Sequence, residues 1–267
     1  MKGWVKALLL IASSSVIADT EIALQGTLTQ GSLILGKAPA GSQVFFNEQP
    51  LQVSPEGRFV FGIGRDAALQ HQLMVKHQNQ QQVIPLQFSQ REYDIQHITG
   101  VAQKYVSPPA EVTARIQSDN QKVRAVRQTL TQDEFIFSSP LKPAEGRISG
   151  VYGSQRIFNG EPRNPHYGLD IAAPTGSPVI APWNGTVLLA DDLYFSGLTL
   201  IIDHGFGVTS TYMHLSKFTV QPGEQIIQGQ KIAEIGATGR VTGPHLDWRL
   251  NWFQERLDPA LLLPATP

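Results

Sequence analysis

The chain has 267 residues, of which 41% are hydrophobic and 16% are charged, and its formal net charge is −1. This length can bury one large core or two modest ones. A near-neutral chain without basic runs gives no electrostatic reason to bind nucleic acid. The chain contains no cysteine, so it forms no disulfides, and any metal must be held by histidine and carboxylate side chains.

Residues 1–18 have the features of a secretory signal peptide. Lys2 and Lys6 give a basic start, residues 7–12 form a short apolar run, and small residues end the segment at Ala18. The apolar run is well short of the ~20 residues that span a bilayer. We therefore expect export to the periplasm or the cell wall, with no membrane segment left after cleavage.

Residues 19–105 are expected to form a small β-sandwich, an accessory domain without chemistry of its own. Short β-type runs alternate here with turns rich in proline and glycine. The runs are residues 32–35, 43–46, 58–61, 73–76 and 82–88. Three histidines of this domain, at positions 71, 77 and 97, show no metal-ligand spacing. A scaffold or substrate-positioning role is the default expectation.

Residues 106–134 are expected to form a linker that contains a helix. Apolar residues recur over positions 110–130 with a period closer to that of a helix than of a strand. Pro109 suits the first turn of such a helix. One apolar stripe should therefore pack on a domain, while the basic residues between its members face solvent.

Residues 135–267 are expected to form an all-β domain. Candidate strands at 179–181, 185–189, 198–202, 208–212 and 231–235 are separated by glycine and proline, and no apolar run has a helical period. The expected fold class is therefore mainly β, with a front β-sandwich, a short helical linker and a larger C-terminal β-domain.

The segment from Gly243 to Trp248 contains the first candidate site residues. Successive side chains of a strand alternate between its faces, so His245 and Asp247 should project to the same side. An imidazole and a carboxylate side by side suit a zinc site. Taken alone, such a pair is more often a simple hydrogen-bonded couple.

The residues of a second pair, His166 and Asp170, are four positions apart in the sequence. On a straight strand the two would lie ~13 Å apart, too far to share one ion. Pro165 and Gly168 argue against a helix, so a shared site requires a bend near Gly168. The simpler alternative is an aspartate that caps a turn beside an unrelated histidine.

Two further histidines follow β-type runs. His214 closes the run that contains Tyr212, and a satisfied core histidine is the commoner role for such a residue. His204 sits at a turn after an apolar strand, and we place it outside the site.

Together these segments resemble the lysostaphin-type (LytM-like) zinc metallopeptidases, which cut peptidoglycan cross-bridges. The similarity extends over residues 146–263 and follows the order of that family's motifs. The matching segments are 166–170, 168–176, 181–187, 202–205, 212–215, 220–224, 236–240 and 243–246. The resemblance implies an antiparallel β-fold with a groove over the metal, and an endopeptidase that hydrolyses peptide cross-links of the bacterial wall.

Carried over by position, His166 and Asp170 would be zinc ligands, and His214 and His245 the catalytic imidazoles. The family has a histidine as third ligand, where this chain has Asp247. Zinc accepts a carboxylate oxygen at about the distance of an imidazole nitrogen, so Asp247 is expected to complete a His-Asp-Asp set. A second carboxylate would, however, leave the bound water less acidified.

Two functional interpretations follow from the resemblance. The first is an active zinc endopeptidase, because four of the five site residues are kept and the fifth can still bind a metal. The alternative is a catalytically degenerate module that binds the wall and regulates a partner amidase. In either case we expect a monomer whose partners are peptidoglycan peptide stems.

Overall fold

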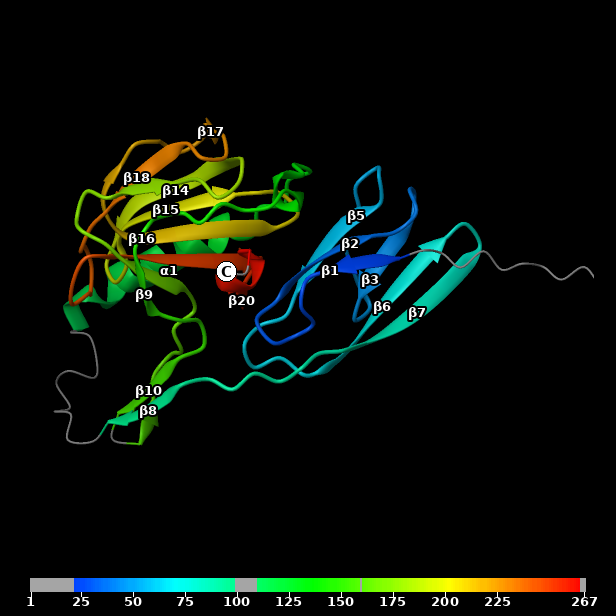
Figure 1. Ribbon diagram of the computed structural model, residues 1–267, viewed down its shortest axis with the longest axis horizontal. Coiled ribbons are helices and arrows are strands. Elements are labelled where there is room, and N and C mark those ends of the chain that lie inside the picture. Colours follow the sequence, from blue (N-terminus) through cyan, green and yellow to red (C-terminus); the bar gives the residue numbers. More distant parts are fainter. Residues whose placement is uncertain (1–21, 99–109, 159, 265–267) are drawn as a thin grey trace, which may run out of the picture.

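The computed structural model describes residues 22–98, 110–158 and 160–264, and they are mainly β (Figure 1). This confirms the expected fold class. The proposed signal peptide at residues 1–18 lies outside the described residues. The expected domain boundaries stay predictions.

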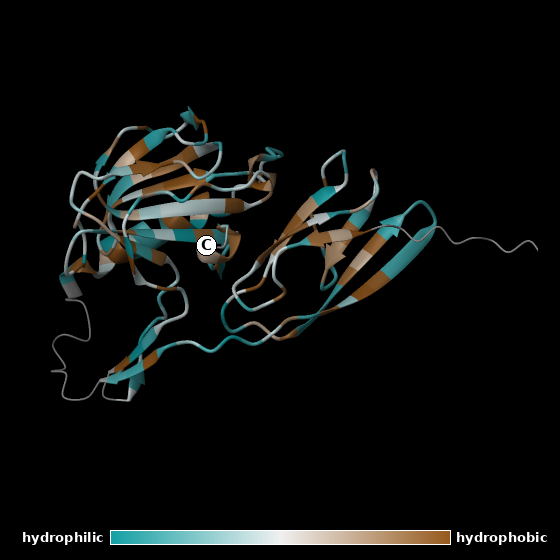
Figure 2. Cartoon of the chain, in the orientation of Figure 1, coloured by the Kyte–Doolittle hydropathy of each residue, from teal (hydrophilic) through white to brown (hydrophobic). Residues whose placement is uncertain are grey.

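Two small sheets form the front of the chain. One has the strand order β1-β2-β5 and the other the order β4-β3-β6-β7. Their strands are β1 (Ala23–Gln25), β2 (Leu33–Lys37), β3 (Gln43–Phe46), β4 (Gln49–Pro50), β5 (Arg58–Gly62), β6 (Gln70–His77) and β7 (Gln80–Gln87). Both sheets contribute to one buried cluster, in which the rings of Phe46 and Phe61 stack with centroids 4.5 Å apart. Apolar segments accordingly lie along these strands (Figure 2).

Strands β2 and β5 of the sheet β1-β2-β5 bury side chains on both faces. Ile34 and Phe61 belong to the front cluster, whereas Leu33 and Val60 belong to the large cluster of the C-terminal part. This division follows from the two-residue period of a strand, which sends neighbouring side chains to opposite faces. The front of the chain is therefore docked on the C-terminal part through apolar contacts.

A ten-stranded sheet forms most of the C-terminal part. Its main path is β17-β14-β15-β16-β19-β12-β9, and β13, β18 and β20 pair off this path. The strands are β9 (Arg147–Gly150), β12 (Leu169–Ala172), β13 (Pro178–Ile180), β14 (Gly185–Leu193), β15 (Gly197–Asp203), β16 (Val208–Phe218), β17 (Gln225–Ile226), β18 (Lys231–Ile235), β19 (His245–Trp252) and β20 (Glu255–Leu257). Neighbouring strands of this sheet pair antiparallel, as the resemblance implies.

The fourth sheet of the described residues has three strands and connects the two parts (Figure 1). After β7 the chain runs to β8 (Ile95–Ile98), which pairs in parallel with β10 (Gln155–Phe158), and β10 pairs with β11 (Glu161–Pro162). Close by, Arg65 Nε donates to the Gly153 carbonyl at 2.9 Å. Residues of the front therefore contact and support the segment that precedes His166.

The linker contains α1 (Thr113–Val126), preceded by a short 3-10 helix (Ala110–Val112). Two more 3-10 turns, Phe135–Phe137 and Pro259–Leu262, complete the regular elements. The helix contacts the end of β14, where Asp119 accepts a hydrogen bond from the Tyr194 amide at 2.8 Å and Lys122 pairs with Asp191 at 2.6 Å. No helix within the three described ranges is long and apolar enough to span a membrane.

Leu33 offers a test of the docking between front and C-terminal part. Its side chain is 2% exposed in the C-terminal cluster. Leu33→Ala should lower the free energy of unfolding by about 2–5 kcal/mol, because it leaves a cavity. Val83→Ala, at a position that is 50% exposed, should change it by no more than about 0.5 kcal/mol. Urea unfolding measures the free energy of unfolding of both variants. If Leu33→Ala loses as little as Val83→Ala, the docked face contributes nothing to stability.

Candidate metal centre

The pairing of β12 with β19 brings two carboxylates together. Asp170 lies directly opposite Asp247, and Ala172 lies opposite His245. Directly opposed residues of antiparallel strands project to the same face, and like charges there destabilise the pair. This register therefore creates a site that requires positive charge.

Glycines on both sides leave room for these carboxylates. Gly150 on β9 lies opposite Asp170, and a Cβ added to it would collide with the Asp170 carboxylate. A Cβ added to Gly168 would collide with Asp247 Oδ1 and approach the Trp248 carbonyl to 2.9 Å. The chain thus keeps both positions next to the carboxylates free of side chains.

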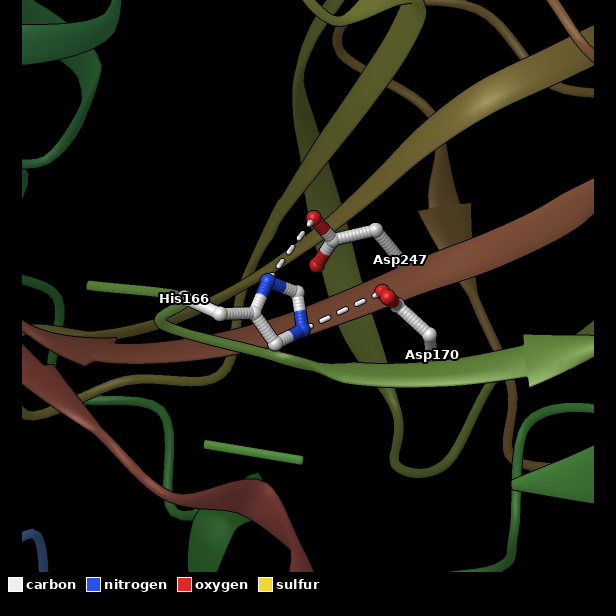
Figure 3. Close-up of side chains that lie close together, drawn as sticks. All are labelled: His166, Asp170 and Asp247. Carbon is white, nitrogen blue, oxygen red and sulfur yellow. Dashed lines mark ion pairs between the residues drawn. The ribbon is translucent and has the colours of Figure 1, made fainter. Parts of the chain in front are cut away.

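His166 reaches the same place from the loop before β12. The chain bends at Gly168, as the separation of His166 and Asp170 requires. The imidazole lies between the two carboxylates (Figure 3), with Nε2 3.2 Å from Asp170 Oδ1 and Nδ1 3.9 Å from Asp247 Oδ2. One donor atom from each of the three residues can be chosen so that all lie within 4.8 Å of one another.

The chemistry of this group fits a metal ion. His166 Nε2 and Asp170 Oδ1 are buried, and neither has a hydrogen-bond partner among the described residues, although they face each other. Burial lowers the pKa of His166, but the Asp170 and Asp247 carboxylates outweigh burial and raise this pKa above its ordinary value. One imidazole and two carboxylates are donors that zinc accepts.

Arg249 also belongs to the site, and the sequence analysis missed it. It lies two residues after Asp247 on the same face of β19, and its Nη2 donates to Asp247 Oδ2 at 2.7 Å. Burial raises the pKa of Asp247, but the charge and hydrogen bonds of Arg249 outweigh burial and hold it below its ordinary value. The Asp-x-Arg spacing on a strand was the signal that could have revealed this pair.

His214 and His245 lie next to the group. Their ring centroids are 4.9 Å apart, and His245 Nε2 lies 4.0 Å from Asp170 Oδ1. His214 Nδ1 contacts the Thr238 carbonyl and His245 Nδ1 the Gly243 carbonyl, each at 2.9 Å. Because a carbonyl only accepts, Nδ1 carries the proton in both rings, and the neutral form of each ring has its lone pair on Nε2. Burial holds the pKa of His214 below its ordinary value.

The backbone of His214 departs from the strand around it. Its φ is 63°, in the left-handed region, and its amide donates to the Ser196 carbonyl at 2.9 Å. The pairing of β16 with β15 and with β18 shifts register close to this residue. Such conformations cost about 1–3 kcal/mol and cluster at functional sites.

His204, in contrast, is a core residue. It is fully buried, its Nδ1 lies 2.8 Å from the Asn184 carbonyl oxygen, and its Nε2 lies 2.7 Å from Ser210 Oγ. Burial lowers its pKa to about 4. His204 therefore belongs to the core and lies outside the group His166, Asp170 and Asp247.

This lowered pKa predicts an acid-sensitive fold. Between pH 6.5 and about 4 the unfolded chain binds a proton at this position and the folded chain does not. Stability is therefore lost as the pH falls through this window, by about 3 kcal/mol from His204 alone. His204→Gln should unfold more easily at neutral pH but lose less stability on acidification. Urea unfolding at several pH values, with a chelator present, measures how the free energy of unfolding changes with pH. The control His97→Gln, at an exposed position, should show the same change with pH as the wild type.

Comparisons with known proteins find similar sequences and a similar fold. Residues 164–259 match peptidase family M23. The peptidoglycan DD-endopeptidases ShyA and ShyB of Vibrio cholerae are similar to this chain, with 34% identity over 141 residues and 42% over 86 residues. The matches cover 52% and 32% of this chain, but only 32% and 20% of the relatives, so the chain spans less than two thirds of their length.

A solved structure shares nearly the whole fold. The crystal structure of a putative M23 peptidase from Pseudomonas aeruginosa is 26% identical, with a TM-score of 0.70, and the match covers 90% of this chain and 96% of that chain. The fold of both the front and the C-terminal part is thus shared with that protein. From the matched segment and these relatives, we conclude that residues 164–259 form a domain of peptidase family M23.

Proposed function

We propose that this protein is a zinc-dependent endopeptidase that hydrolyses peptide cross-links of bacterial peptidoglycan. The observation that carries this proposal is the group His166, Asp170 and Asp247, whose donor atoms lie within 4.8 Å of one another beside two more imidazoles. The relatives ShyA and ShyB, which are named peptidoglycan DD-endopeptidases, support the substrate class. With such a substrate, we propose that the protein acts outside the cytoplasm, in the periplasm or at the cell wall.

His166, Asp170 and Asp247 would hold the zinc ion through one nitrogen and two carboxylate oxygens. All three are at least four-fifths buried, with exposed side-chain fractions of 19%, 20% and 4%. Three protein ligands are the usual number in catalytic zinc sites, which keep a further position for water or substrate. Zinc bound there supplies Lewis acidity toward the scissile carbonyl and toward water.

His214 and His245 would carry the proton transfers. Each ring is fixed by its Nδ1 contact to a backbone carbonyl, so that Nε2 is the atom available to the reaction. The lowered pKa of His214 keeps its ring neutral at neutral pH, the form that can accept a proton. One imidazole takes the proton of the attacking water on Nε2 and passes it to the leaving amine, while the other, protonated on Nε2, donates to the oxyanion.

A first test concerns the ligands. Protein purified without chelators should carry about one zinc per chain by elemental analysis. Asp247→Ala should bind zinc at least about tenfold more weakly, since second-shell losses alone cost 10–100-fold. Wild-type protein that carries no zinc and regains none on titration would contradict the proposal. It would favour the alternative of a degenerate module that regulates a partner amidase.

A second test separates the catalytic imidazoles from the ligands. His214→Ala and His245→Ala should each abolish turnover of cross-linked muropeptides but retain zinc, because neither residue belongs to the ligand group. His97→Ala, at an exposed position of β8, is the matched control and should keep full activity. If either variant at the site loses its zinc, that residue is a ligand and the assigned role is wrong.

A further inference from the structure

The contact between Asp247 and Arg249 is more extensive than a single ion pair. Arg249 Nε lies 3.0 Å from Asp247 Oδ1 and 3.2 Å from Oδ2, and Nη2 lies 2.7 Å from Oδ2. The guanidinium therefore contacts both oxygens of the carboxylate that is proposed to bind zinc. The Asp247 side chain is 4% exposed and that of Arg249 is 26% exposed. Solvent consequently screens this pair less than it screens a surface ion pair.

Arg249 changes the charge of the donor set. His166 with two carboxylates would contribute two negative charges to the site, and Arg249 offsets one of them. The couple of Asp247 and Arg249 carries no net charge, as a neutral imidazole ligand would. With a divalent cation bound beside Asp170 and this couple, the net charge of the site would thus stay positive, despite the second carboxylate.

We infer that Arg249 is a positioning residue that serves as the built-in counter-charge of Asp247 and competes with the bound zinc for that charge. This inference rests on the zinc site of the proposed function. An ionised carboxylate has about four lone-pair sites, so Arg249 can donate to Asp247 while the carboxylate keeps a site for an ion. Without the ion, Arg249 keeps two opposed carboxylates from destabilising the strand pair β12–β19.

Competition between Arg249 and zinc for the charge of Asp247 has a definite thermodynamic consequence. Removal of Arg249 should destabilise the zinc-free protein, because Asp247 is then a buried charge with one partner fewer. The zinc-loaded protein should lose less, since the ion itself supplies positive charge. By linkage, the variant must then bind zinc more tightly than the wild type. A purely structural role of Arg249 would instead lower the stability of both states equally and leave zinc affinity unchanged.

The experiment compares the wild type with Arg249→Gln in the full-length protein. Zinc affinity is measured by competition with a chromophoric chelator, and thermal unfolding is recorded with zinc and with EDTA. We expect Arg249→Gln to bind zinc about tenfold more tightly, since unit charges a few ångströms apart interact by more than that in a protein. Its melting temperature should fall clearly in EDTA and much less with zinc. Unchanged or weaker zinc binding would overturn the inference.

Two variants serve as controls. Arg249→Lys keeps the charge and should keep zinc affinity near that of the wild type. Arg256→Gln removes a positive charge whose guanidinium lies 4.3 Å from the centroid of the Tyr167 ring, and it should leave zinc affinity unchanged. If Arg256→Gln tightens binding as much as Arg249→Gln does, the effect belongs to the general positive charge around the site and the inference falls.

A double variant covers the case in which Arg249→Gln does not fold. Asp247→Asn together with Arg249→Gln removes both charges of the pair, and this double variant should fold without zinc. If it also fails to fold, Arg249 is needed for packing and the inference is wrong. The zinc site itself is tested on the wild type. Suppose that the wild type binds zinc and cleaves muropeptides, but Arg249→Gln binds zinc no more tightly than the wild type. The proposed function then stands, and only the inference about Arg249 is refuted.

Discussion

Two carboxylates that cannot move apart are the constraint on which the site depends. Asp170 and Asp247 are directly opposed because β12 and β19 pair in one register. The core fixes that register, since Ile171 and Trp248, which alternate with the two aspartates, are fully buried. A slip by one residue would send Asp247 into the apolar core and Trp248 out of it. Positive charge must therefore come to the carboxylates, and the chain itself brings it from Arg249.

The sequence predicted those features of the site that depend on local periodicity. His245 and Asp247 share a face of β19 because alternate residues of a strand do so, and the strand begins at His245, directly after Pro244. The bend at Gly168 followed from the distance that four strand residues would span. Two predicted strands, 43–46 and 231–235, have the observed bounds of β3 and β18.

Apart from Arg249, which lies only two residues from Asp247 on β19, the features that the sequence did not predict depend on pairings between distant segments. The opposition of Asp170 and Asp247 requires the register of two strands that are more than seventy residues apart. The parallel pairing of β8 with β10 joins a strand of the front to the loop before His166, and no periodic pattern encodes such a contact. The need for a glycine at position 150 is likewise visible only when β9 lies beside β12. The zinc ligands and the roles of the histidines remain proposals.

The left-handed backbone at His214 has an evolutionary consequence. Glycine would adopt this conformation without strain, and asparagine, like histidine, is one of the few other residues that tolerate it. Selection for stability alone would therefore favour loss of the imidazole at this position. The role proposed for His214 would be an instance of the usual trade between activity and stability, in which a functional residue is kept at a thermodynamic cost. In a lineage that no longer needed the chemistry, position 214 would be among the first to drift.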